Sequence, residues 1–163
     1  GSGAIGLSIK KFRSEAEVVL ADISPGALAT ATENANALGL KAELVQSDLF
    51  ADLQDRRFHL IVSNPPYIPR DLVPGLELDV QGFEPHLALD GGYDGFELYN
   101  RIIQGAPDHL VDGGRLLFEA GDGQAGDLAQ RMVTAGFTID TEERDLIGVL
   151  RAVGGYKNSY KEQ

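Results

Sequence analysis

The chain carries an apolar run that two consecutive prolines must bring to an end. His59–Ser63 is followed directly by Asn64-Pro65-Pro66-Tyr67. Proline offers no backbone N–H to a neighbouring strand and its ring fixes φ, so a strand over this run must stop in a rigid corner whose carbonyl groups point outward. The corner therefore constrains both where a strand lies and which groups its tip presents.

The residues of this corner suit a planar amide or amine. Asn64 adds a side-chain oxygen and Tyr67 adds a flat ring. An NH2 group held between these acceptors would have both hydrogens engaged, which leaves its nitrogen lone pair directed at an electrophile, while the ring covers the planar face. This pattern indicates methyl transfer to nitrogen. An ordinary strand-ending turn is the alternative that these four residues leave open.

Short β-rich runs alternate with helical stretches along the chain, which predicts an α/β domain with a mostly parallel sheet. Ser24 can cap a helix that has Pro25 in its first turn and Gly39 at its end. Further helices are expected near Ile5 to Phe12, from Phe96 to Ala106 and over residues 123–135, and strands over residues 17–21, 43–46, 58–63, 115–119, 137–142 and 147–153. A short connection joins the last two strands, so they should pair as an antiparallel hairpin.

Composition excludes several classes of function. The 163 residues fit one domain, and no apolar run or basic leader predicts a membrane span or a secretory signal, so a cytoplasmic protein is expected. There is no cysteine, and three scattered histidines lack ligand spacing, so no metal site is expected. A net charge of −11 argues against stable nucleic-acid binding, which relies on Lys and Arg.

Candidate ligand groups follow the first two strands, at the sheet edge where α/β domains bind ligands. Gly1 and Gly3 would let the backbone approach a ligand closely. Asp22 ends one strand with a carboxylate suited to ribose hydroxyls, and Asp48 ends the next, where it could accept from an adenine amino group. Each aspartate alone also fits a helix cap or a solvated loop, so the series carries the interpretation.

A dinucleotide site is the nearest rival. Residues 1–6 fit the pattern G-x-G-x-x-G, and Asp22 lies about 20 residues further on, as a nicotinamide dehydrogenase requires. That interpretation gives no role to Asp48 or to the proline corner, and no downstream His, Lys or Tyr stands out as a hydride-transfer acid. Bound S-adenosylmethionine would use all of these residues.

With the glycine turn, the two aspartates and the proline corner in place, the chain resembles a class I S-adenosylmethionine-dependent methyltransferase. Further motifs resemble those of the peptide chain release factor glutamine methyltransferases, and the resemblance runs from Gly1 to about Val153. These motifs are Phe83-Glu84-Pro85, Ala88-Leu89, Gly91-Gly92, Asp94-Gly95, Tyr99, Leu117-Phe118-Glu119, Asp145-Leu146, Gly148 and Arg151. The proline corner is shared with adenine and guanine amino-group methyltransferases, whereas residues 83–95 are more specific.

The resemblance implies a Rossmann-like fold and methylation of the glutamine side-chain amide in the Gly-Gly-Gln loop of a release factor. S-adenosyl-L-methionine would be the methyl donor and S-adenosyl-L-homocysteine the product. The implied catalytic residues are Asn64, Pro65, Pro66 and Tyr67, the cofactor residues Gly1, Gly3, Asp22, Ile23, Asp48, Leu49 and Asn64, and the substrate residues Asn64, Pro65, Tyr67 and Glu84. The loop from Ile68 to Gly95 is expected to grip the acceptor, with the roles of Glu84 and Glu119 left open.

The chain departs from the family pattern at its start. Family members place a strand, an Asp-x-Gly-Thr segment and a helical domain before the glycines. Because that strand is central in the family sheet, we expect a gap with an unpaired ladder on both sides. Residues 1–154 are expected to be an N-terminally truncated catalytic domain, with residues 155–163 a flexible tail. Two alternatives stay open: an adenine or guanine amino-group methyltransferase on DNA or RNA, and a non-catalytic fragment that binds cofactor or partner.

Overall fold

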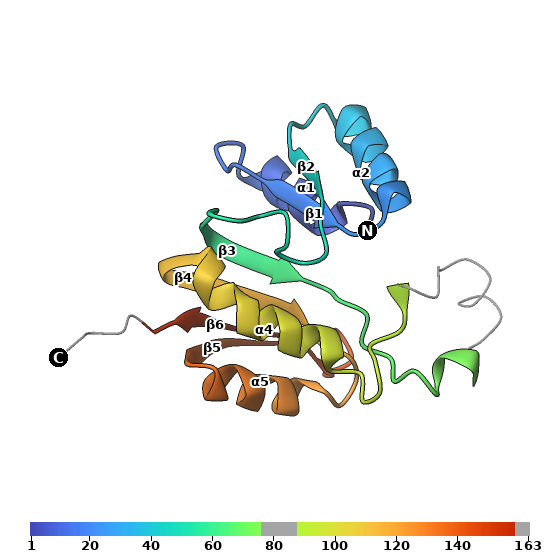
Figure 1. Ribbon diagram of the computed structural model, residues 1–163, viewed down its shortest axis with the longest axis vertical. Helices are drawn as coiled ribbons and strands as arrows, with labels where there is room; N and C mark the ends of the chain where they lie inside the picture. The colour runs from blue at the N-terminus through green and yellow to red at the C-terminus, as the bar shows by residue number, and fades with distance from the viewer. Residues whose placement is uncertain (76–87, 159–163) are drawn as a thin grey trace. The chain divides into compact units, whose positions relative to one another are not determined.

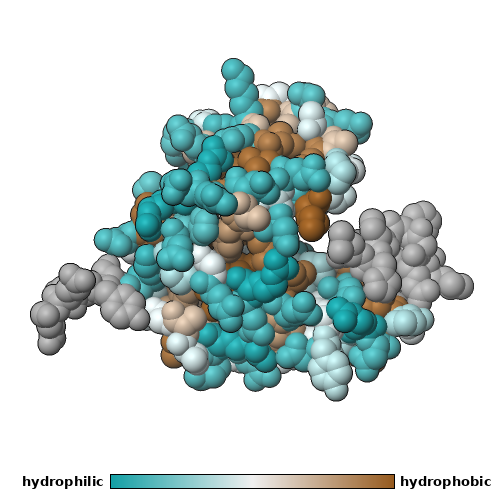
Figure 2. All heavy atoms as spheres, in the orientation of Figure 1, coloured by the Kyte–Doolittle hydropathy of each residue, from teal (hydrophilic) through white to brown (hydrophobic). Residues whose placement is uncertain are grey.

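The computed structural model describes residues 1–75 and 88–158. These residues fall into two compact units, one formed by residues 1–56 and the other by the chain from residue 57 onward. Each unit has its own sheet, and helices accompany both (Figure 1). Hydrophilic side chains cover most of the face shown in Figure 2, in keeping with 25 acidic and 14 basic residues.

The first unit is built from two parallel strands and two helices. In chain order these are α1 (Ala4–Phe12), β1 (Val19–Asp22), α2 (Pro25–Leu38) and β2 (Glu43–Gln46). The two strands pair from Val19 opposite Glu43 to Asp22 opposite Gln46. Their carboxyl ends therefore lie side by side, which is the edge at which an α/β sheet binds its ligands.

The ends of α2 are those that the sequence predicts. The Ser24 hydroxyl accepts a hydrogen bond from the Ala27 backbone N–H at 3.2 Å, and Pro25 occupies the first turn. Gly39 ends the helix in the left-handed conformation with φ 64°, which an L side chain adopts at a cost. The prediction of this helix is confirmed.

Helix α1 buries a different face from the one expected. Ile5, Ile9 and Phe12 share helical spacing, yet Phe12 is 76% exposed and the buried residue of the helix is Leu7. The reason is close packing on β1, because a Cβ added at Gly6 would lie 2.3 Å from Leu20 Cδ2. The helix thus approaches the strand along Gly3, Gly6 and Leu7, and Phe12 lies on another face.

The second unit holds four strands in the order β3-β4-β6-β5. Its elements are β3 (Phe58–Ser63), η1 (Val73–Gly75), α4 (Glu97–His109), β4 (Leu110–Glu119), α5 (Ala125–Thr134), β5 (Phe137–Arg144) and β6 (Leu150–Lys157). Strands β3 and β4 are parallel, while β6 is antiparallel to both β4 and β5. The antiparallel carboxyl-terminal hairpin is therefore confirmed.

Large side chains from several elements fill the core of this unit. The rings of Tyr99 and Phe118 meet edge to face with their centres 5.2 Å apart, and both residues are fully buried. Leu128 and Met132 of α5 and Val153 of β6 are also fully buried. Helix α5 packs on β5 and β6, and α4 packs on α5 and β4. This core fixes the loops that follow β3 and β4.

The described strands form two sheets, one in each unit. Two strand boundaries differ from those that the sequence predicts. Strand β4 starts at Leu110 where residue 115 was expected, because Leu110 already pairs with Phe58 before a bulge. Strand β6 continues to Lys157, beyond the expected end at Val153. Within residues 1–75 and 88–158 no helix is long and apolar enough to cross a membrane.

Candidate functional site

The candidate cofactor residues of the first unit gather where β1 and β2 end. Asp22 is the last residue of β1, and its Oδ1 accepts a hydrogen bond from the Ser24 backbone N–H at 2.8 Å. Its Oδ2 lies beside the backbone nitrogen of Gly1. The backbone N–H of Ser47 donates to the Asp22 carbonyl at 3.0 Å. Gly1, Asp22 and the residues after β2 are thus neighbours in space.

The glycine turn before α1 brings the main chain close to β1. Gly3 has φ 76°, and a Cβ there would lie 3.0 Å from Leu20 Cδ1 and 3.2 Å from Ala31 Cβ. A side chain at this position would be strained and crowded. Gly1 is exposed, and nothing lies within 4 Å of where its Cβ would be. Gly3 therefore fixes the turn, while Gly1, beside Asp22, leaves the main chain accessible.

Leu49 is held in an unusual backbone conformation directly after Asp48. Its φ of 53° lies in the left-handed region, which costs a bulky L residue roughly 1–3 kcal/mol. Ser47 supports the turn, because its buried hydroxyl donates to the Leu49 carbonyl at 2.9 Å and accepts from the Asp52 backbone N–H at 3.0 Å. Asp48 itself is exposed. Backbone strain of this kind concentrates at ligand sites. Ser47, which supports the strained turn, was not among the residues that the sequence predicts for the site.

The proline corner of the second unit follows β3 as predicted. Strand β3 ends at Ser63, Pro65 is buried, and Asn64 is exposed beside it. The Tyr67 carbonyl accepts a hydrogen bond from Gln124 Nε2 at 3.0 Å. The corner is therefore anchored after its exposed asparagine, by the burial of Pro65 and by the hydrogen bond to the Tyr67 carbonyl.

Three glycines of the family-specific motifs and of the loop after β4 press on Tyr67. A Cβ at Gly91 would lie 2.7 Å from the Tyr67 carbonyl carbon, and one at Gly95 would lie 2.4 Å from the Tyr67 oxygen. A Cβ at Gly121 would lie 2.8 Å from Cδ2 of the Tyr67 ring. These distances are too short for any real Cβ, so only glycine permits this packing around the tyrosine.

A short parallel pairing joins the chain after the corner to residues 89–92. The Ile68 carbonyl accepts from the Gly91 backbone N–H at 2.8 Å, and Arg70 N–H donates to the Gly92 carbonyl at 2.8 Å. The Arg70 guanidinium also binds the Asp90 carboxylate at 2.8 Å. The two described ends of the expected acceptor loop are therefore hydrogen-bonded to each other directly after the corner. Glu84 lies outside the described residues.

Tyr99 is hydrogen-bonded to the end of β4 and to the loop that follows it. Its hydroxyl donates to the Glu119 backbone carbonyl at 2.8 Å, and burial raises its pKa well above the ordinary value, partly offset by a hydrogen bond from the Gly121 backbone. The hydroxyl therefore stays protonated and acts as a donor. The side chain of Glu119 is exposed, so this contact uses its main chain.

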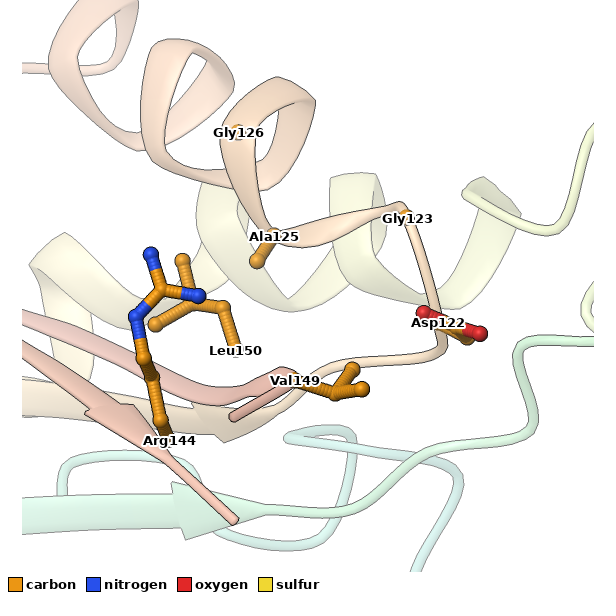
Figure 3. Close-up of a pocket in the computed structure, with 7 residues that line it drawn as sticks. All are labelled: Asp122, Gly123, Ala125, Gly126, Arg144, Val149 and Leu150. Atoms are coloured by element: carbon orange, nitrogen blue, oxygen red, sulfur yellow. The ribbon is translucent and has the colours of Figure 1, made fainter. Parts of the chain in front are cut away.

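A separate pocket of about 320 Å³ opens beside the start of α5. Asp122, Gly123, Ala125, Gly126, Arg144, Val149 and Leu150 line it (Figure 3). In that view Asp122 and Arg144 lie at opposite ends, and the Arg144 guanidinium donates to the Gly148 carbonyl at 2.8 Å. None of the residues that the sequence predicts for the site lines this pocket.

The turn between β5 and β6 is fixed by Asp145. Its Oδ1 accepts from the backbone N–H groups of Ile147 at 3.0 Å and Val149 at 2.9 Å, and Arg151 Nε donates to its Oδ2 at 3.1 Å. Burial acts to raise the pKa of Asp145, but these hydrogen bonds outweigh it and lower the pKa overall. The motif residues Asp145, Gly148 and Arg151 thus build one turn.

Comparison with known proteins identifies relatives across nearly the whole chain. The methyltransferase small domain family matches residues 1–72. The release factor glutamine methyltransferase of Geobacter sulfurreducens is 43% identical over 155 residues, which cover 95% of this chain and 55% of that protein. The chain therefore spans about half the length of the curated relatives that it matches.

Solved structures give the fold. A methyltransferase from Pyrococcus furiosus has a TM-score of 0.71 at 17% identity, covering 95% of this chain and 69% of that one. The release factor-specific protein-(glutamine-N5) methyltransferase from Alicyclobacillus acidocaldarius has a TM-score of 0.51 at 20% identity, covering 98% of this chain and 94% of that one. The Rossmann-like class I methyltransferase fold is confirmed.

Proposed function

The chain is a relative of the release factor glutamine methyltransferases, and from this relationship we propose that it transfers a methyl group from S-adenosyl-L-methionine to a glutamine side-chain amide. The acceptor that we propose is the glutamine of a Gly-Gly-Gln loop in a peptide chain release factor. The protein partner is then that release factor, and the cytoplasm, where such factors act, is the proposed location.

The observation that carries this proposal is the way the proline corner is held. Asn64 is exposed at the tip of β3, while Pro65 beside it is buried and the Tyr67 main chain is bonded to Gln124. A flexible turn would not need three glycines at distances that exclude a Cβ. The corner is therefore rigid and presents one amide side chain and one aromatic ring, which are the groups that a planar carboxamide requires.

These residues address the main difficulty of the reaction. An amide nitrogen is a weak nucleophile because its lone pair is delocalised into the carbonyl group. We propose that the Asn64 side-chain oxygen and the Pro65 carbonyl accept the two N–H hydrogens of the acceptor, and that the Tyr67 ring packs on the amide plane. Pro66 keeps the corner stiff. Positioning of this kind can lower a barrier by roughly 7–11 kcal/mol in favourable cases.

We propose that the first unit supplies the groups that hold the methyl donor. Asp22 would accept from the ribose hydroxyls, and Asp48 would accept from the adenine amino group. The open main chain at Gly1, the tight turn at Gly3, the exposed Ile23 and the fixed turn at Leu49 suit the rest of a nucleoside. The donor, when bound, supplies a methyl group on a positively charged sulfur. Asn64 is proposed as a further contact to it.

Two alternatives remain for the test to exclude. The proline corner also occurs in methyltransferases of adenine and guanine amino groups, but a net charge of −11 disfavours binding to a phosphate backbone. A non-catalytic fragment would keep its affinity for the donor and transfer nothing.

The deciding experiment supplies labelled S-adenosyl-L-methionine together with a release factor, a Gly-Gly-Gln peptide or RNA. We expect label on the protein and the peptide, recovered as N5-methylglutamine after digestion. A matched peptide with Gly-Gly-Asn in place of Gly-Gly-Gln should accept nothing, since its amide is one methylene shorter. Label on RNA would favour the nucleic-acid alternative, and binding of the donor without transfer to any acceptor would favour the fragment.

A further inference from the structure

The side chain of Gln124 makes a hydrogen bond to a residue far away in the sequence. It directly precedes α5, yet its side chain makes no capping hydrogen bond to that helix. Its Nε2 instead donates to the Tyr67 carbonyl, 57 residues earlier in the chain, at 3.0 Å. A hydrogen bond from its own backbone N–H to the Gly121 carbonyl at 3.1 Å closes the turn from which the side chain reaches the corner.

The space around this contact is closed on two sides. A Cβ at Gly121 would lie 2.3 Å from Gln124 Oε1, and one at Gly95 would lie 2.7 Å from Gln124 Nε2. The same Gly95 position is 2.4 Å from the Tyr67 oxygen. The amide group and the carbonyl that it binds therefore lie between two glycines, and a side chain at either glycine would displace them.

The orientation of the Gln124 amide is also determined. Its Oε1 is buried, and it has no hydrogen-bond partner among the described residues. Turning the amide over would place this oxygen against the Tyr67 carbonyl, so two acceptors would face each other. Burying an unpaired amide oxygen costs free energy that a methionine of similar length would avoid. What glutamine adds at this position is the N–H donor.

We propose that Gln124 is a positioning residue for methyl transfer: it holds the Tyr67 main chain so that the ring and the corner lie in the geometry that the acceptor amide requires. This inference rests on the proposed function. Gln124 acts through Tyr67 and has no contact of its own with the reacting atoms in the proposal. A displacement of about 1 Å in a reacting group can cost roughly 100-fold in rate, so a single hydrogen bond to this carbonyl is enough to matter.

Two substitutions separate the donor from the shape of the side chain. Gln124→Met keeps the length and removes the donor. Gln124→Glu keeps the length and donates only when its carboxyl group is protonated, which burial favours. Gln130→Met and Gln130→Glu are matched controls, since Gln130 is exposed on the same helix α5.

We expect Gln124→Met to lower kcat about 10- to 100-fold, with the Kd for S-adenosyl-L-methionine unchanged within about twofold. Gln124→Glu should be equally slow at about pH 8 and should recover relative to wild type as the pH falls towards about 5, because the neutral carboxyl group donates again. Gln124→Met should show no such recovery, and both Gln130 variants should match wild type throughout. A merely structural role would not produce recovery in the glutamate variant alone.

A readout that does not depend on activity is hydrogen exchange of the Gln124 side-chain NH2, which should be slower than that of Gln130. Exchange as fast as that of Gln130 would overturn the inference, as would wild-type kcat in Gln124→Met or identical pH profiles for the two Gln124 variants. If Gln124→Met fails to fold, the pH profile of Gln124→Glu against Gln130→Glu decides. An inactive wild-type protein refutes the proposed function itself, whereas an active one with an unaffected Gln124→Met refutes this inference alone.

Discussion

Gly95→Ala is the sharpest single test of how the proline corner is packed. Gly95 is buried with φ 79°, and the added Cβ would lie 2.4 Å from the Tyr67 carbonyl oxygen. The left-handed conformation costs an L residue roughly 1–2 kcal/mol. Reduced freedom of the unfolded chain returns about 0.4–1 kcal/mol of that. Overpacking of a closed site adds about 1–3 kcal/mol, because the Tyr67 main chain must move by about 1 Å to restore ordinary contact.

Gly113→Ala is the matched control. Gly113 lies in the same unit with φ 70°, but it is exposed and nothing lies within 4 Å of where its Cβ would be. The backbone strain and the unfolded-state gain are therefore common to both variants. The difference between their free energies of unfolding isolates the contact with Tyr67, and it should be about 1–3 kcal/mol in favour of Gly113→Ala.

Urea unfolding of wild type and both variants, followed by circular dichroism and extrapolated to water, measures that difference. Gly95→Ala should also transfer methyl groups about 100-fold more slowly to a Gly-Gly-Gln peptide, since its effect falls on the corner, while Gly113→Ala should stay near wild type. Equal losses of stability in the two variants would show that Gly95 is retained for its φ alone. The argument that the glycines exist to fit Tyr67 would then fail.

Three further predictions follow from the same geometry. Asn64→Ala should abolish methyl transfer while leaving the Kd for S-adenosyl-L-methionine within a few-fold, whereas Asp22→Ala should chiefly raise that Kd. Calorimetry measures the Kd and the transfer assay measures the activity of each variant. If Asn64→Ala is active, Asn64 has no part in the mechanism. Tyr99→Phe should lower the free energy of unfolding by about 1–3 kcal/mol, because the Glu119 carbonyl loses its donor. The stability of wild type should also fall above about pH 10, because Tyr99 ionises at a lower pH in the unfolded chain than in the folded one. The variant should lack this fall. For Asp145 the lowered pKa means that the unfolded state binds the proton more tightly, so the turn is stabilised above pH 3.8 and loses this support as the pH falls further. The turn amides of wild type should therefore lose protection from hydrogen exchange, relative to their intrinsic exchange rates, as the pH falls, whereas those of Asp145→Asn should not.

Local signals in the sequence were enough to place most elements. Ser24, Pro25 and Gly39 determine where α2 starts and ends because each solves a problem of the helix terminus itself. The short connection after β5 likewise predicts the antiparallel hairpin. Long-range pairing sets other boundaries, and β4 begins at Leu110 because that residue meets Phe58, which no local pattern reveals.

The candidate site divides in the same way. The proline corner after β3, Asp22 at the end of β1 and Asp48 shortly after β2 could be predicted, since a strand followed by a polar residue is a local pattern. The strain at Leu49 and its support by Ser47 are not, because φ depends on contacts that the turn makes after folding. The bond from Gln124 to the corner spans 57 residues and has no periodic signature.

The geometry explains why the corner and the glycines occur in one chain. The role that we propose for Asn64-Pro65-Pro66-Tyr67 needs one fixed geometry, but a loop after a strand has no intrinsic reason to stay in one conformation. Gly91 and Gly95 meet the Tyr67 main chain, and Gly121 meets its ring. These glycines therefore allow the surrounding main chain to pack against Tyr67 and hold the corner in one conformation. The corner depends on the glycines for this fixed geometry.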